Sequence, residues 1–139
     1  MGDGPEPLAA TAHFRGQSSY RCERKNYTLN LQGWRPGSVL TDSVTDEFFL
    51  LSLCRDKYYV HQHTVLQLWK ELGLFPLEFR YVELTIDGES RGVYLLVEKL
   101  DRLRIVDEGI LAVLRRGSRQ GKTHVELKYL HGTVKSVEA

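Results

Sequence analysis

Alternating apolar and polar residues mark the first predicted strand of the chain. Tyr27, Leu29 and Leu31 are separated by single polar residues, which is the two-residue period of a half-buried β-strand. Gly33 follows, with a proline and a second glycine soon after it, and these residues favour a turn. The pattern predicts a strand over residues 24–32.

A long segment without glycine or proline runs from Thr45 to about Leu72. Gly73 and then Pro76 follow, as is typical of a helix end. Because the segment exceeds the usual helix length, we expect a break near residues 58–60 and therefore two helices rather than one. Its large apolar residues recur at mixed three- and four-residue intervals; they are Phe48, Leu51, Tyr58, Val65, Leu68, Trp69 and Leu72.

Two hairpins are predicted after the helical segment. Residues 79–86 alternate in character, and Asp87-Gly88, which tolerates the positive φ angles of a tight turn, separates them from the apolar run 93–97. The apolar run 110–114 and the alternating residues 125–129 predict the second hairpin. The fold class is therefore α+β, a mainly antiparallel sheet with one long or two shorter helices packed on it.

Composition and charge narrow the class of protein further. The chain has 139 residues, 42% of them hydrophobic, which suits one soluble domain. Residues 1–12 are small and polar and contain two prolines, so we expect a flexible leader before a single domain over 13–139. The formal net charge of +1 creates no overall attraction to nucleic acid or anionic membrane. Cys22 and Cys54 can form at most one disulfide bond, and we expect both to be reduced and buried.

The sequence contains no recognisable membrane span and no signal peptide for export. No apolar run approaches the length of a membrane span, and the first twelve residues lack the basic and apolar regions of a signal peptide. We therefore expect no membrane partner and leave the compartment unassigned.

Three separated segments carry a further pattern. They are Arg15-Gly16-Gln17-Ser18-Ser19 with Arg24-Lys25-Asn26-Tyr27, then Asp46 with Arg55-Asp56 and Glu71-Leu72-Gly73, and finally Asp87-Gly88 with residues 92–98. In this order and spacing they resemble the spore-coat H (CotH) family of atypical protein kinases, over about residues 13–129. The resemblance implies a protein-kinase-like N-terminal lobe. It also implies that the complete family domain uses ATP and Mg²⁺ to phosphorylate Ser or Thr of a protein substrate.

The resemblance places the ATP phosphates at the first of these segments. Fixed positive charges and hydroxyl groups there would donate hydrogen bonds to phosphate oxygens. Strand alternation puts Lys25 on the face of Tyr27, whereas the family pattern aligns its regular lysine with Arg24, so we retain both. Without the resemblance, the same residues would form a polar turn and a solvated strand edge. The candidate phosphate-binding residues are Arg15, Ser18, Ser19, Arg24 and Lys25.

Two further sets of residues acquire roles from the resemblance. Glu98, Lys99 and Leu100 follow an apolar strand at the position of a kinase hinge, which implies that they line the adenine pocket. The alternative for Glu98 is an ion pair with Lys99 or Arg102 at the strand end. Arg55 and Asp56, within the predicted helix, would position a phosphate-contacting residue or form surface ion pairs.

The residues that would complete a kinase are missing from this pattern. Phosphoryl transfer needs carboxylates that hold Mg²⁺ and a residue that orients the attacking oxygen. In the family these lie in Asp-containing motifs after the matched part, and the acids from residue 110 onwards are Glu126 and Glu138. We therefore expect a nucleotide-side lobe without its catalytic lobe, inactive alone. We also expect it to self-associate through an apolar face, formed by Tyr94, Leu96, Leu100 and Leu103.

A basic segment supports a second class of function. Residues 115–122 contain four positive charges around small residues at the predicted hairpin tip. They would suit a noncatalytic module that binds a nucleotide or a protein partner. No recognition helix accompanies them, so we do not expect nucleic acid as the partner.

His61 and His63 are two residues apart and point away from each other on a helix, so they are expected to be solvated or capping residues rather than metal ligands.

Overall fold

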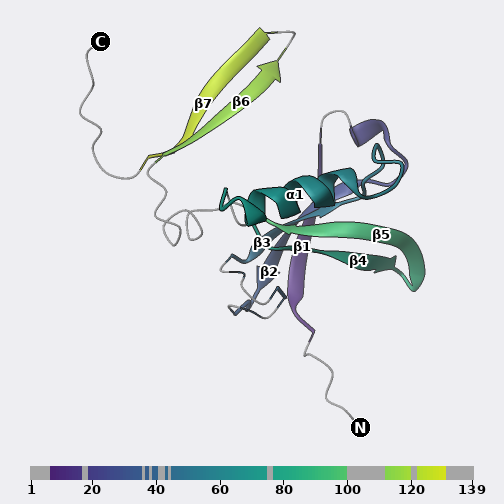
Figure 1. The fold of residues 1–139 in the computed structure, drawn as a ribbon. Coiled ribbons are helices and arrows are strands. Elements are labelled where there is room, and N and C mark those ends of the chain that lie inside the picture. The colour runs from purple at the N-terminus through teal and green to yellow at the C-terminus, as the bar shows by residue number, and fades with distance from the viewer. Residues whose placement is uncertain are drawn as a thin grey trace, which may run out of the picture. The chain divides into compact units, whose positions relative to one another are not determined.

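The computed structural model describes residues 7–16, 19–35, 37, 39–40, 43, 45–74 and 77–99, and the backbone of 112–119 and 122–130. The chain divides into two compact units, Met1–Leu100 and Asp101–Ala139 (Figure 1). The second unit contains a two-stranded antiparallel sheet of β6 (Ala112–Arg119) and β7 (Lys122–Leu130). This hairpin confirms the second pair of predicted strands.

The first unit is built on a five-stranded sheet with the order β1-β2-β3-β5-β4. Neighbouring strands are antiparallel throughout, and the one α-helix among the described residues lies between β3 and β4 in sequence. The α+β class is therefore confirmed. The elements are β1 (Ala9–Arg15), the 3-10 helix η1 (Ser19–Arg21), β2 (Asn26–Gln32), β3 (Glu47–Leu51), α1 (His61–Glu71), β4 (Phe79–Ile86) and β5 (Glu89–Glu98).

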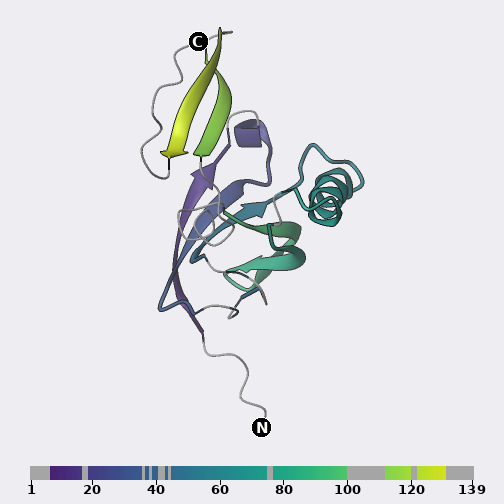
Figure 2. The ribbon, with the colours of Figure 1, turned by 60° about the vertical axis from the view of Figure 1, so that its left-hand side comes forward.

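Each face of the sheet carries a separate hydrophobic cluster. On one face, residues of β3 and β5 pack with Leu40, Trp34 and Val39 from the connection between β2 and β3. On the other face, Leu95 and Val97 of β5 pack with Leu66 of α1. Figure 2 views α1 almost along its axis, to one side of the sheet. The helix therefore covers one face, and the β2–β3 connection covers the other.

The first of the two predicted helices is wrong, because residues 47–51 form β3. This strand lies between β2 and β5, so its side chains meet a hydrophobic cluster on both faces: Phe48 on one and Phe49 on the other. A strand buried on both faces loses the two-residue alternation and reads as a continuous apolar run. The expected break near residues 58–60 coincides with the true start of α1 at His61, and Gly73 follows its end with φ 67°.

The N-terminal boundary also differs from the prediction. Residues 9–12, assigned to the leader, belong to β1, which pairs with β2 from Ala9 opposite Gln32 to Arg15 opposite Asn26. β1 is an edge strand whose side chains are mostly exposed, so its sequence carries little hydrophobic pattern. The hairpin of β4 and β5 is confirmed, and Asp87 and Gly88 have the expected positive φ angles of 53° and 79°.

The expectation of two reduced cysteines is wrong, because Cys22 and Cys54 form a disulfide bond. The residues are 32 positions apart in sequence, and their Cα atoms lie 6.2 Å apart. Cys22 precedes β2 and Cys54 follows β3, so the antiparallel pairing of these two strands brings the cysteines together. This separation of Cα atoms is within the range that a disulfide requires.

The apolar face expected to be uncovered is closed where the structure describes it. Tyr94 and Leu96 are only 2% and 5% exposed, because the β2–β3 connection packs over them. Leu100 and Leu103 lie outside the described residues. Exposed apolar residues occur instead on α1, where Leu68 and Trp69 are examples. Over the described part of the chain, no helix has the length and apolar character needed to cross a membrane.

Candidate functional site

A groove of about 330 Å³ lies between the segment that carries η1 and the segment that joins β3 to α1. Its polar residues come from both segments and from the first turn of α1, and its apolar floor comes from the end of β3 and the residues that follow. The residues that line it are Ser19, Asn26, Leu51, Leu53, Cys54, Arg55, Asp56, His61 and Gln62. We call it the phosphate groove, because Ser19, which lines it, is one of the residues that the sequence predicts to bind phosphate.

The first wall of the groove depends on a glycine. Gly16 follows β1 with φ 104°, a backbone conformation that residues with a Cβ rarely adopt. A Cβ at this position would also overlap the hydroxyl oxygen of Ser19. Gly16 therefore allows the chain to turn tightly enough for Ser19 to reach the groove.

Asn26 connects the two segments that form the walls. Its Oδ1 accepts hydrogen bonds from the backbone N–H and the hydroxyl of Ser52, both at 2.7 Å. Its Nδ2 donates to the hydroxyl oxygen of Ser19 at 3.0 Å. The Cys22–Cys54 disulfide joins the same two segments covalently.

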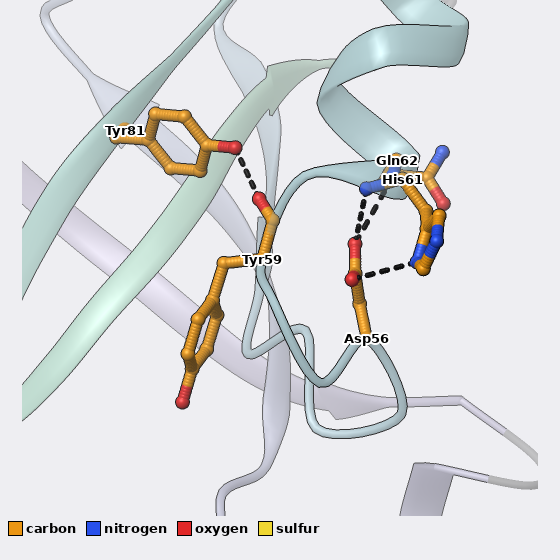
Figure 3. Close-up of polar contacts among 5 residues, drawn as sticks. All are labelled: Asp56, Tyr59, His61, Gln62 and Tyr81. Carbon is orange, nitrogen blue, oxygen red and sulfur yellow. Dashed lines mark hydrogen bonds and ion pairs between the residues drawn. The ribbon is translucent and has the colours of Figure 1, made fainter.

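Asp56 caps the helix that forms one end of the groove (Figure 3). Its Oδ2 accepts hydrogen bonds from the backbone N–H groups of His61 at 2.6 Å and Gln62 at 3.3 Å, and its Oδ1 lies 2.8 Å from His61 Nδ1. The N-cap residue Val60 makes no side-chain cap hydrogen bond, so Asp56 performs this role from four residues upstream.

The same contacts govern the protonation of Asp56. Desolvation by burial alone would raise its pKa, but hydrogen bonds from the Gln62 and His61 backbone, with the hydrogen bond and charge of the His61 ring, outweigh that effect and lower the pKa. Asp56 is therefore ionised at neutral pH, and its charge is directed at the N-terminus of α1, which favours an anion.

A tyrosine pair holds the segment that precedes α1. The Tyr81 hydroxyl donates to the backbone carbonyl of Tyr59, whose φ is 60° (Figure 3). Desolvation by burial, and then the negative charge of Asp56, raise the pKa of Tyr81, so this hydroxyl stays protonated and able to donate. His63 stacks on the Tyr81 ring at 4.9 Å, whereas His61 contacts Asp56, so the two histidines take separate roles.

The structure brings one of the predicted phosphate-binding residues, Ser19, together with Arg55, for which only a supporting role was predicted. Ser19 and Arg55 both line the phosphate groove, one on each side. Arg55 lies in the segment between β3 and α1 rather than in a helix, which corrects its expected setting. Arg15 is not among the lining residues, and its guanidinium lies 3.5 Å from the centre of the Phe49 ring. Ser18 lies outside the described residues.

Arg24 and Lys25 lie elsewhere. Both precede β2, so the strand alternation used to separate them does not apply. The Arg24 guanidinium donates to the Tyr59 hydroxyl at 3.0 Å and to the Val93 carbonyl. The Lys25 ammonium donates to the Tyr20 carbonyl at 2.7 Å. Neither residue lines the phosphate groove.

Two of the three predicted hinge residues, Glu98 and Lys99, contact neighbouring strands or strand ends of the sheet. Glu98 is fully buried at the end of β5, and its Oε2 accepts from the backbone N–H of Glu78 at 3.1 Å. Lys99 forms an ion pair with Glu47, so the expected alternative of an ion pair between Lys99 and Glu98 is wrong, whereas the one with Arg102 stays a prediction. Leu100 and Arg102 lie outside the described residues.

Asn26 was not predicted as a residue of the site, and the capping role of Asp56 was not predicted either. An Asp a few residues before a helix is a recognisable capping signal, but the helix was expected to start near Thr45, so Asp56 fell inside it. The basic segment 115–122 was expected to form a loop, but β6 continues through it to Arg119, which pairs with Lys122 of β7.

Among the described residues, no group of three or more His, Cys, Asp or Glu side chains could hold a metal ion.

Comparison with known families assigns the chain. A family model described as CotH kinase protein matches residues 12–113, which is more than half of the chain. The chain therefore belongs to the CotH kinase family. No curated protein matches the chain.

Proposed function

We propose that residues 7–99 form the nucleotide-binding lobe of an ATP-dependent protein kinase, with the phosphate groove as the site of the ATP phosphates. In the complete family domain, this lobe would serve transfer of the γ-phosphate to Ser or Thr of a protein substrate. The five-stranded antiparallel sheet with α1 between β3 and β4 supports a kinase-like N-terminal lobe, since protein kinases also place a helix after their third strand.

The observation that carries the proposal is the convergence of Ser19 and Arg55 on one groove. A hydroxyl donates one hydrogen bond, and a guanidinium donates several and carries a permanent charge, so together they suit phosphate oxygens. The Asp56 carboxylate also lies in the groove, but it faces the N–H groups of α1, which reduces its repulsion of an anion.

The metal that accompanies ATP receives no ligand in this proposal. Phosphoryl transfer uses Mg²⁺ to neutralise charge on the phosphates. The described residues fit the phosphates but contain no cluster of three or more metal-ligating side chains. A lobe that contacts the phosphates from one side binds ATP weakly, with a Kd of about 1 mM, or about 4 kcal/mol of binding free energy.

An NMR titration of the full chain with ATP tests the proposal, because it detects millimolar binding residue by residue. The backbone amide signals of Ser19, Arg55 and Gln62 should move together. Ser19→Ala and Arg55→Ala should each weaken binding about tenfold, which corresponds to about 1.4 kcal/mol. Arg35→Ala is the matched control, because Arg35 is exposed and lies outside the groove.

Two results would overturn the proposal. One is the absence of any shift in these amides at ATP concentrations up to about 10 mM. The other is binding that Arg35→Ala weakens as much as Arg55→Ala does, since that would indicate a nonspecific effect of positive charge.

A further inference from the structure

The orientation of the Asn26 carboxamide is determined by its neighbours. The backbone N–H of Ser52 can only donate, so the atom that faces it must be the acceptor, Oδ1. The other end of the carboxamide is then the NH₂ group, which faces the hydroxyl of Ser19 at 3.0 Å. The Ser19 oxygen therefore accepts this hydrogen bond and does not donate it.

This arrangement decides what the Ser19 hydroxyl can offer to a ligand. A serine hydroxyl has one hydrogen, and a hydroxyl that accepts from one neighbour keeps its hydrogen for another acceptor. In the described part of the chain, the hydrogen-bond partner of the Ser19 side chain is Asn26, and Ser19 lines the phosphate groove. A phosphate oxygen in the groove is an acceptor of the required kind.

We propose that Asn26 is a positioning residue that keeps the Ser19 hydroxyl hydrogen available to a phosphate oxygen in the groove. This inference rests on the proposed function, and it gives Asn26, which also lines the groove, a role that acts through Ser19. Asn26 is suited to the role because it is half-buried, begins β2 opposite Arg15, and is fixed at its Oδ1 by two hydrogen bonds from Ser52.

The substitution Asn26→Asp reverses this hydrogen bond with little change in shape. One carboxylate oxygen would still accept from Ser52, but the other can only accept, so the Ser19 hydroxyl would have to donate to it. The hydrogen would then be withdrawn from the groove. The added negative charge would also weaken ATP binding directly, so the variant alone is not decisive.

A double-mutant cycle separates the two effects. ATP binding is measured by NMR for the wild-type chain, Asn26→Asp, Ser19→Ala and the double variant, with thermal melting of each to confirm folding. Ser19→Ala should weaken binding about tenfold in the wild-type background and less than about twofold in the Asn26→Asp background, because the hydroxyl no longer donates to the ligand there. An equal loss in both backgrounds would overturn the inference, since charge alone acts independently of Ser19.

A measurement on the unaltered chain keeps the inference testable if Asn26→Asp fails to fold. The side-chain NH₂ signals of Asn26 should move on ATP addition in the wild-type chain, and at equal ATP occupancy they should move much less in Ser19→Ala. Movement of the same size in both proteins, or none in either, would overturn the inference. If ATP does not bind the groove of the wild-type chain at all, the proposed function fails; if ATP binds and the cycle is additive, only the role of Asn26 fails.

Discussion

Removal of the Cys22–Cys54 disulfide should destabilise the chain substantially. The bond closes a loop with a sequence separation of 32 residues. In the chain-entropy description, such a cross-link removes about 12 cal/mol/K from the unfolded state, or about 3.7 kcal/mol at 25 °C. This is a large fraction of the total stability of a typical domain, which is about 5–15 kcal/mol.

Urea unfolding with and without a dithiol reductant measures this effect. For a slope of roughly 1–3 kcal/mol per molar urea, the loss of about 3.7 kcal/mol should lower the midpoint by at least about 1 M. The variants Cys22→Ala and Cys54→Ala provide the control. Either substitution breaks the same bond, so the double variant should be about as unstable as each single variant.

Three results would refute the reasoning. The first is a thiol count of two in the unreduced, denatured chain purified under oxidising conditions, because it would show that the bond does not form. The second is a midpoint that reduction leaves unchanged. The third is a double variant whose loss equals the sum of two large single losses, because the cysteines would then contribute as separate side chains.

Two further substitutions test the walls of the phosphate groove. Asp56→Ala should lower the melting temperature, because His61 and Gln62 lose their acceptor. Because folding lowers the pKa of Asp56, the ionised carboxylate contributes fully to stability above about pH 4, and this contribution is lost as the pH falls further. The melting temperatures of the wild-type chain and Asp56→Ala should therefore converge in acid. A difference between them that stays constant down to about pH 2 would contradict this reasoning. Gly16→Ala and its control Gly33→Ala both place an alanine at positive φ, at a cost of about 1–2 kcal/mol in folding free energy. Only Gly16→Ala should abolish ATP binding in the NMR titration, because its Cβ would overlap the Ser19 hydroxyl, whereas nothing lies within 4 Å of a Cβ at Gly33. Equal ATP binding by the two glycine variants would show that Gly16 is not needed to form the site.

The elements that could be predicted from sequence are those with local signals. β2 was found from the alternation around Leu29, and the β4–β5 hairpin from Asp87-Gly88. β3 could not be found in this way, because it is central in the sheet and packs against apolar neighbours on both faces. Its assignment requires knowledge of its partners, which lie far away in the sequence.

The residues of the candidate site also divide into those with a signal in the sequence and those that depend on strand pairing. Ser19 was predicted as a phosphate-binding residue and Arg55 as a supporting residue, both through the order of family motifs, and both line the groove. The disulfide and the role of Asn26 depend on the register of β2 with β3, which composition and spacing do not reveal. The error over β3 also concealed the capping role of Asp56, because a capping residue is recognised only when the helix start is correctly placed.

The pairing of β2 with β3 sets the geometry of the Ser19 side of the groove. Tyr27 lies opposite Leu50 in this register, and a slip of one residue would move every side chain of β2 to the other face of the sheet. Asn26 would then turn away from Ser52. The disulfide opposes such a slip, because it joins the chain just before β2 to the chain just after β3.

The Asp56 side of the groove is held differently, by the helix. Among the described residues of α1, only Leu66 is buried. The helix is otherwise held by the stacking of His63 on Tyr81, by the Asp56 cap at its start and by the 2.7 Å ion pair of Lys70 with Glu78 near its end. Because exposed ion pairs contribute little, α1 can be displaced at a smaller cost in free energy than the sheet. A displacement of α1 would therefore change the position of Asp56 in the groove and leave the Ser19 side in place.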